Sequence, residues 1–238
     1  MIDAISILFS GGSDSTLAAV HALQRARTVH LLTFPRGFMF CREKPEKLVD
    51  EMRARFGAER IVRHIEPIGR EYRRCYFDRM PQRLRRYRTF YIPWMCGACK
   101  LAMHLRTIAY NQKHGISVTY DGANSASAPV FPDQTTEYID VAKRLYRDHG
   151  MEYDCPVFSI AKTDRELELA GIERTRDTKR EHLFYRNQHT CYVGVILHAH
   201  ARLYYRPMHG VDRMPRLAAQ FLEESIAGLV DNHEDGLQ

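Results

Sequence analysis

The sequence has no long apolar run and no basic, apolar leader. No apolar stretch reaches the roughly 18 residues needed to span a membrane, and residues 1–9 lack the basic start of a signal peptide. Internal repeats and low-complexity tracts are also absent, so the 238 residues fit one α/β domain better than a repeat array. We therefore expect a cytoplasmic protein with no membrane partner.

Cysteine is too sparse for a disulfide framework, and lysine is far rarer than arginine. Six cysteines in a chain of this length favour thiols, metal ligands or catalytic groups over disulfides. The net charge of +6 comes from 35 Lys+Arg against 29 Asp+Glu. This balance suits phosphate-rich partners without deciding the function.

The Walker A pattern GxxxxGK[ST] is missing, which disfavours ordinary γ-phosphoryl transfer. A different loop follows the apolar run 4–9 and precedes a helical pattern that begins near Ser15. Paired glycines let a phosphate approach the backbone N–H groups, and a helix N-terminus adds unpaired N–H groups. The loop predicts an anion site with hydroxyl donors and one carboxylate for Mg²⁺, formed by Ser10, Gly11, Gly12, Ser13, Asp14, Ser15 and Thr16.

Strand and helix patterns alternate along the rest of the chain. Strands are expected at 28–34, 60–65 and 117–120, and helices at 15–25, 44–56, 136–149, 193–205 and 214–229. This order predicts a doubly wound, mainly parallel, five-stranded sheet with helices on both faces. A ligand is expected at the carboxyl ends of the strands, where the strand order reverses. We treat 1–238 as a single domain with a helical, arginine-rich insertion around residues 69–95.

The insertion alternates arginines with aromatic side chains. Guanidinium groups pair with phosphate and aromatic rings stack on bases, so RNA or an acidic substrate is one interpretation. A solvated helical hairpin broken at Pro81 is the other. The arginines are Arg70, Arg73, Arg74, Arg79, Arg83, Arg85, Arg86 and Arg88.

Cys96 and Cys99 form a Cys-x-x-Cys pair just before a helical pattern at 101–109. Two thiolates at this spacing can share a metal or a cluster. The helix N-terminus, with Lys100 and Arg106, would lower their pKa values. A metal needs further ligands: Cys191 is the candidate third, and Cys41, Cys75, Cys155 or a histidine could be the fourth.

The loop at residues 10–15, directly after a first strand, resembles the pyrophosphate loop of the PP-loop superfamily, the N-type ATP pyrophosphatases. The resemblance implies ATP and Mg²⁺ as cofactors, attack of a substrate oxygen on the α-phosphate, and release of pyrophosphate. It implies that Thr33 and Phe34, at the end of the second strand, lie against adenine. Lys162 looks like the lysine that these families place near the phosphates, although a lysine at a helix start is the plainer interpretation.

The Cys-x-x-Cys region resembles the tRNA 2-thiocytidine synthetase type of PP-loop enzyme. Such enzymes hold a [4Fe–4S] cluster on a Cys-x-x-Cys pair and one distant cysteine, which implies metal ligation by Cys96, Cys99 and Cys191. A sulfur donor and a tRNA acceptor are implied too. The sequence departs from this type at residues 121–124, Asp-Gly-Ala-Asn, where a Gly-His-His-x-x-Asp-Asp-like stretch usually stands.

The second half resembles 7-cyano-7-deazaguanine synthase in the order of residues 124, 130–134, 160–162 and 190–192. That family converts a carboxylate to an amide and a nitrile with ammonia and ATP, which implies a small acidic metabolite as acceptor. Its structural zinc lies on four cysteines, and those that should follow Cys191 are missing here.

Two enzymatic hypotheses follow from these resemblances. The main one is an adenylating sulfurtransferase acting on a tRNA base, and the alternative is an amide- or nitrile-forming ligase with zinc or no metal at the cysteines. Either enzyme could be a homodimer, and a nucleotide sensor without chemistry is a third interpretation. The expected catalytic residues are Asp14, Cys96, Cys99, Cys191 and Lys162, and Asp121 and Asn124 join the loop, Thr33 and Phe34 in the cofactor site.

Overall fold

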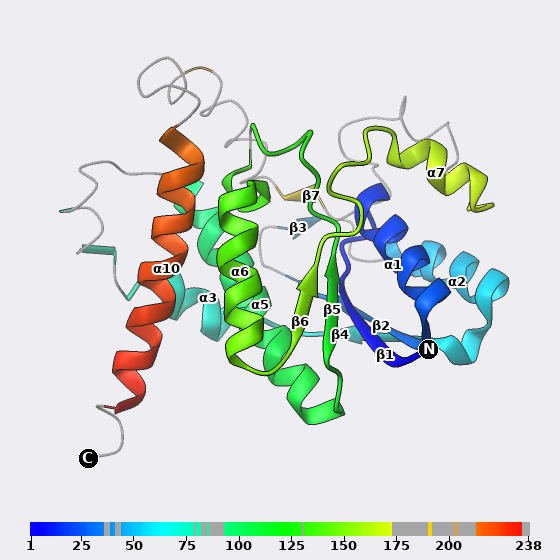
Figure 1. Cartoon of the computed structure of the whole chain (residues 1–238), viewed down its shortest axis with the longest axis horizontal. Coiled ribbons are helices and arrows are strands. Elements are labelled where there is room, and N and C mark those ends of the chain that lie inside the picture. Colours follow the sequence, from blue (N-terminus) through cyan, green and yellow to red (C-terminus); the bar gives the residue numbers. More distant parts are fainter. Residues whose placement is uncertain are drawn as a thin grey trace.

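The computed structural model describes residues 1–35, 39–40, 44–78, 80–81, 85, 93–129, 131–172, 190–191, 203 and 213–234. Within these ranges, five parallel strands form one sheet in the order β4-β2-β1-β5-β6 (Figure 1). The strands are β1 (Ile2–Leu8), β2 (Ala26–Thr33), β4 (Ile61–Ile65), β5 (Val118–Asp121) and β6 (Glu152–Asp154). The predicted doubly wound parallel sheet is therefore confirmed.

Helices cover both faces of the sheet (Figure 1). One face carries α1 (Ser13–Arg25), α2 (Lys44–Phe56) and the short α7 (Thr163–Leu169). The other carries α3 (Gly69–Tyr76), α5 (Pro93–His114), α6 (Thr136–Asp148) and α10 (Arg213–Glu234). Single 3₁₀ turns, η1 (Ala58–Arg60) and η2 (Pro132–Gln134), precede β4 and α6.

Successive side chains of the central strand β1 point to opposite faces of the sheet, and apolar side chains are buried on both faces. Ile5 and Ile7 are fully buried in the cluster that includes the α1 side chains. Leu8, on the opposite face, packs in a second cluster with Cys99 of α5. Ser6 shares that face, and its Oγ lies 2.9 Å from Thr119 Oγ1 of β5. The sheet is thus a central layer between two helical layers.

A separate antiparallel pair joins β3 (Met39–Phe40) to β7 (Thr190–Cys191) on the side of the sheet where the strands end (Figure 1). The backbone of Cys191 lies opposite Met39 in this ladder. A residue far along the chain is thereby placed beside the segment that follows β2.

The helix boundaries differ from the expected ones mainly at α5. It begins at Pro93, so Cys96 and Cys99 lie inside the helix and not before it. Proline is well tolerated in the first turn of a helix, because the N–H it lacks would have no partner there. The expected helix at 214–229 is present as α10, whereas the expected helix at 193–205 lies, apart from residue 203, outside the described residues. No helix in the described part of the chain is long and apolar enough to cross a membrane.

Candidate active site

A cavity of about 300 Å³ opens where the strand order reverses, between the carboxyl ends of β1 and β5. The helices that follow these two strands lie on opposite faces of the sheet, so the strand ends diverge and leave a crevice. Its wall is formed by the end of β1 and the loop after it, the ends of β2 and β5, and one side of α5. The lining residues include Leu8, Phe9, Ser10, Gly12, Asp14, Ser15, Thr33, Phe34, Lys100, Met103, Asp121 and Gly122.

The loop after β1 is closed by its own hydrogen bonds. Gly11 has a φ of 75°, a left-handed conformation that favours glycine. The hydroxyls of Ser15 and Thr16 donate to the Gly12 carbonyl at 3.1 and 2.8 Å, and the Gly12 N–H donates to Ser10 Oγ at 3.3 Å. Gly12 is the N-cap residue of α1 and supplies no side-chain cap. The positive end of α1 is therefore presented at the cavity.

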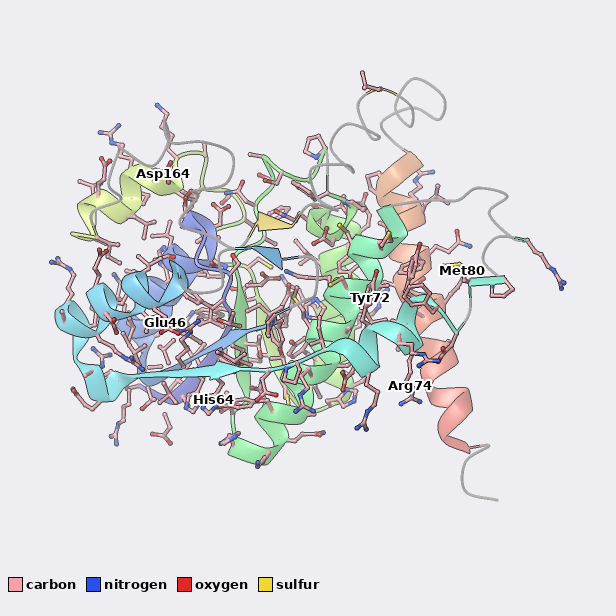
Figure 2. The ribbon with its side chains drawn as sticks, turned by 180° about the vertical axis from the view of Figure 1, so that it is seen from behind. Glu46, His64, Tyr72, Arg74, Met80 and Asp164 are labelled. Carbon is pink, nitrogen blue, oxygen red and sulfur yellow. The ribbon has the colours of Figure 1, made fainter. Side chains whose placement is uncertain are left out.

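The predicted loop residues divide into two groups. Ser10, Gly12, Asp14 and Ser15 line the cavity. Three others are not part of its wall and shape the loop: Gly11 by its φ, Thr16 by its bond to Gly12, and Ser13 by donating its hydroxyl to Asp164 of α7 at 2.6 Å. Figure 2 shows the position of Asp164 on α7.

Asp14 is held by the chain that follows β5. Asn124 Nδ2 donates to Asp14 Oδ1 at 3.4 Å and to the Ile160 carbonyl at 3.0 Å. A Cβ added at Gly122 would lie 2.4 Å from the backbone nitrogen of Ser15, so the β5 loop passes directly against the first turn of α1. One carboxylate at this position, with nucleotide phosphates, is a donor set that suits Mg²⁺.

Thr33 and Phe34 form the wall at the end of β2, with 2% and 5% of their surfaces exposed. Among the described residues, none makes a hydrogen bond with Thr33 Oγ1. A buried hydroxyl without a partner on a cavity wall suits a ligand that supplies one. Met103 of α5 adds apolar surface to the same cavity.

Lys100 was not expected in this wall. Its Nζ lies 2.5 Å from Asp121 Oδ2, and the two side chains are only 12% and 4% exposed. The Tyr153 hydroxyl donates to the same Asp121 oxygen at 2.6 Å. Burial lowers the pKa of Lys100, but the charges of Asp121 and Asp133 outweigh burial, so the pKa is raised. Burial raises the pKa of Asp121, but the charge of Lys100 outweighs burial, so that pKa is lowered. Both groups are therefore charged.

Behind this pair, His104 occupies the next turn of α5. It is fully buried, and its Nδ1 lies 3.3 Å from the Tyr146 hydroxyl. Burial, followed by the charge of Lys100, lowers the pKa of His104 to about 3. The imidazole is thus neutral, and among the described residues that line the cavity Lys100 is the only cation.

Neither Cys96 nor Cys99 is part of the cavity wall. Cys99 is 4% exposed and packs among Leu8 and other apolar side chains, and Cys96 is half-buried. The ammonium of Lys100 faces Asp121, and Arg106 pairs with Glu66 at 2.7 Å, so both expected cations have acidic partners. The helix begins at Pro93, so Cys96 lies at the end of its first turn and Cys99 in its second.

The other cysteines occupy different places. Cys75 of α3 is 2% exposed, and Cys155 is 8% exposed with its Sγ 3.6 Å from the Tyr153 hydroxyl. Burial raises the pKa of Cys155 to about 12, so this thiol stays protonated. Cys41 and the Cys191 side chain lie outside the described residues. Among the side chains that are described, no three His, Cys, Asp or Glu are placed to hold a metal ion.

Lys162 precedes α7, is exposed, and is not among the residues lining the cavity. The α3 arginines (Arg70, Arg73 and Arg74) are exposed, and Arg74 lies on the outer side of α3 (Figure 2). Arg85 is exposed as well, whereas residues 79, 83, 86 and 88 lie outside the described ranges.

Sequence reasoning missed Lys100 because the start of α5 was placed too late. With a helix beginning at Pro93, positions 96, 99, 100 and 103 share one side of it. Lys100 is then a lone cation on a side that also carries a buried cysteine and Met103. That pattern, with the carboxylate at the end of β5, was the available signal.

The chain is similar to one protein family and to several solved structures. The family model described as queuosine biosynthesis protein QueC matches residues 4–201. No curated protein sequence matches the chain. Similar solved structures include a protein described as a predicted subunit of a tRNA methyltransferase from Methanocaldococcus jannaschii, with 20% identity, 70% of this chain and 74% of that chain covered, and a TM-score of 0.44.

Two further structures cover 93% of this chain. One is a 4-thiouridine synthetase–RNA complex with bound ATP, with 15% identity, 53% of that chain covered and a TM-score of 0.49. The other is the U34-tRNA thiolase NcsA from Methanococcus maripaludis with its [4Fe–4S] cluster, with 13% identity, 73% of that chain covered and a TM-score of 0.46.

Proposed function

Because the chain belongs to the QueC family of PP-loop, ATP-dependent enzymes, we propose that it activates a carboxylate of a small acidic metabolite with ATP and forms a carbon–nitrogen bond there. The observation that carries the proposal is the cavity between β1 and β5, where the Gly12 loop and the α1 N-terminus face the end of β5. A site of this kind concentrates donors for phosphate oxygens at one point.

The reaction has two displacements. A carboxylate oxygen of the acceptor attacks the α-phosphorus of ATP, and the bond to the pyrophosphate oxygen breaks, leaving an acyl adenylate. Ammonia then attacks the acyl carbon and loses one proton to solvent, and AMP leaves with the electron pair of the broken bond. The protein's part is to hold the phosphates at the loop and to align the acceptor with them.

The proposal assigns a role to each group on the cavity wall. The loop N–H groups and Ser10 bind the pyrophosphate portion, and Thr33 and Phe34 lie against adenine. Asp14, oriented by Asn124, would hold Mg²⁺. When bound, Mg²⁺ neutralises phosphate charge.

Sulfur transfer to a tRNA base is the second candidate, and the cysteines favour it. Cys96 and Cys99 lie one turn apart on the helix that carries Lys100 and Met103 into the cavity wall. The β3–β7 ladder places the backbone of Cys191 on the side of the sheet where the strands end. These three residues would hold a [4Fe–4S] cluster, which supplies sulfide when bound.

Pyrophosphate release tests the shared step and separates the routes. Protein purified without oxygen is given ATP and Mg²⁺ with either aromatic carboxylic acids and ammonium, or undermodified tRNA and sulfide. We expect one AMP and one pyrophosphate per amide formed in the first mixture and none in an Asp14→Asn variant. Release only with tRNA and sulfide supports the second candidate, and release in neither mixture overturns both.

Metal content gives an independent measurement of the cysteines. About four iron and four acid-labile sulfide per chain, lost in Cys96→Ala, support the sulfur route. Stoichiometric zinc without sulfide, or no metal, supports the carboxylate route. A His149→Ala variant, altered on the far end of α6, is the matched control.

A further inference from the structure

We propose that Lys100 is the cationic side chain that contacts the phosphates of the bound nucleotide, and that Asp121 and Tyr153 hold it in position. The inference rests on ATP binding as proposed above, and it assigns to Lys100 the role that the PP-loop resemblance implied for Lys162. Lys162 is exposed before α7 and is not part of the cavity wall, whereas Lys100 is.

The position of Lys100 follows from the sheet. Asp121 ends β5 and is paired with Leu8 at the end of β1. It therefore lies beside the first residues of the loop at residues 10–16, the phosphate loop. The next residue, Gly122, lies against the first turn of α1. Because Lys100 Nζ is 2.5 Å from Asp121 Oδ2, its ammonium lies in the same cavity as that loop.

The charges of the nucleotide phosphates explain why the Lys100–Asp121 ion pair is present in the cavity wall. A buried ion pair costs desolvation and is seldom a net source of stability compared with apolar side chains. Without Lys100, the Asp121 carboxylate would repel nucleotide phosphates across the cavity. With Lys100 it fixes an ammonium there, and the Tyr153 hydroxyl fixes the carboxylate at 2.6 Å.

The ammonium acts electrostatically in the first displacement. As the acceptor oxygen bonds to the α-phosphorus, the bond to pyrophosphate breaks and both of its electrons leave with pyrophosphate. Negative charge grows on the non-bridging and leaving oxygens. Lys100 stays protonated throughout and donates hydrogen bonds to those oxygens, so its removal is expected to lower kcat about 10²–10³-fold.

The first variant to measure is Lys100→Met, but it leaves the Asp121 carboxylate buried and unpaired, and it can fail to fold. The double variant Lys100→Met/Asp121→Asn removes both charges and keeps similar shapes. We expect the double variant to unfold at a temperature close to that of the wild type and still to lose the activity. Lys100→Arg should recover part of it, and Lys143→Met, altered at a surface pair on α6, should match the wild type.

Two readouts keep this inference separate from the proposed reaction. If the proposed reaction is wrong, the wild-type protein will not release pyrophosphate. ATP affinity measured by calorimetry still tests the role of Lys100 in that case. We expect the folded double variant to bind ATP at least tenfold more weakly than the wild type. Wild-type affinity and kcat in that variant would overturn the contact.

The positioning role of Tyr153 has its own test. Tyr153→Phe should lower kcat while leaving the ATP KM within about threefold, because the ammonium is present but less well held. A lower unfolding temperature with unchanged kcat would show a structural role only, and would refute positioning.

Discussion

Thr33→Val should make the protein more stable and a weaker binder of ATP at the same time. The Thr33 side chain lies on the cavity wall, 2% exposed, and no described residue hydrogen-bonds its hydroxyl. In the unfolded chain the same hydroxyl is hydrated. Folding without the nucleotide therefore forfeits a hydrogen bond, and binding restores it if Thr33 contacts adenine.

The change in stability and the change in ATP affinity have separate expected magnitudes. An unsatisfied buried hydroxyl costs about 1–3 kcal/mol, and valine puts a methyl group of similar size in its place. A gain of about 1 kcal/mol raises Tm by roughly 2–4 °C in a chain of this length. Loss of one neutral hydrogen bond to the nucleotide, worth about 0.5–1.5 kcal/mol, weakens ATP binding roughly two- to tenfold.

Thermal unfolding without nucleotide and calorimetric titration with ATP measure both effects. Thr33→Ser keeps the hydroxyl and loses only a methyl group, so it should bind ATP nearly as the wild type does while unfolding at a lower temperature. Unchanged ATP affinity in Thr33→Val would refute the contact with the nucleotide. A lower Tm in that variant would refute the reasoning about the unpaired hydroxyl.

Three further predictions concern other parts of the molecule. Gly122→Ala should abolish ATP binding in calorimetry, because the added Cβ would lie 2.4 Å from the Ser15 backbone nitrogen. In the control variant Gly69→Ala the added Cβ meets nothing within 4 Å, so this variant should bind ATP normally. Equal ATP affinities of the two variants would contradict the prediction. Replacing the α3 arginines with glutamine should weaken tRNA binding and flatten its salt dependence if tRNA is the acceptor, and unchanged RNA affinity would identify them as plain solvated surface. The free energy of unfolding should fall as pH drops from about 6.5 towards 4. In this range the unfolded chain protonates His30 and His104, whereas burial holds their pKa values in the folded protein at about 4 and about 3. Urea midpoints that do not change with pH would contradict this.

The phosphate loop was predictable because its signal is local. An apolar strand, two glycines and a helix start stand within about a dozen consecutive residues, and each has a direct conformational meaning. The loop has the expected form, with Gly11 at a positive φ and α1 beginning at Ser13. The family match confirms the PP-loop resemblance that the loop suggested.

The opposite wall was harder to predict because its contacts are set by the sheet. Lys100 and Asp121 are 21 positions apart, and they meet only because β5 is inserted beside β1 and α5 packs over that edge. The spacing of Cys96 and Cys99 predicted two thiols close enough to share a metal. It could not show that Cys99 would pack against Leu8, since that depends on where α5 crosses the sheet.

The central position of β1 also bears on how the chain acquires its structure. Ser6 on β1 bonds to Thr119 on β5, 113 residues later. During synthesis the phosphate loop emerges well before β5, so one edge of β1 stays open until more than a hundred further residues have been added. Pairings of such long range make folding slow and leave an apolar strand edge exposed meanwhile. A nascent chain that ends before residue 121 therefore carries the loop without the wall it faces, and nucleotide cannot assist its folding until β5 is in place.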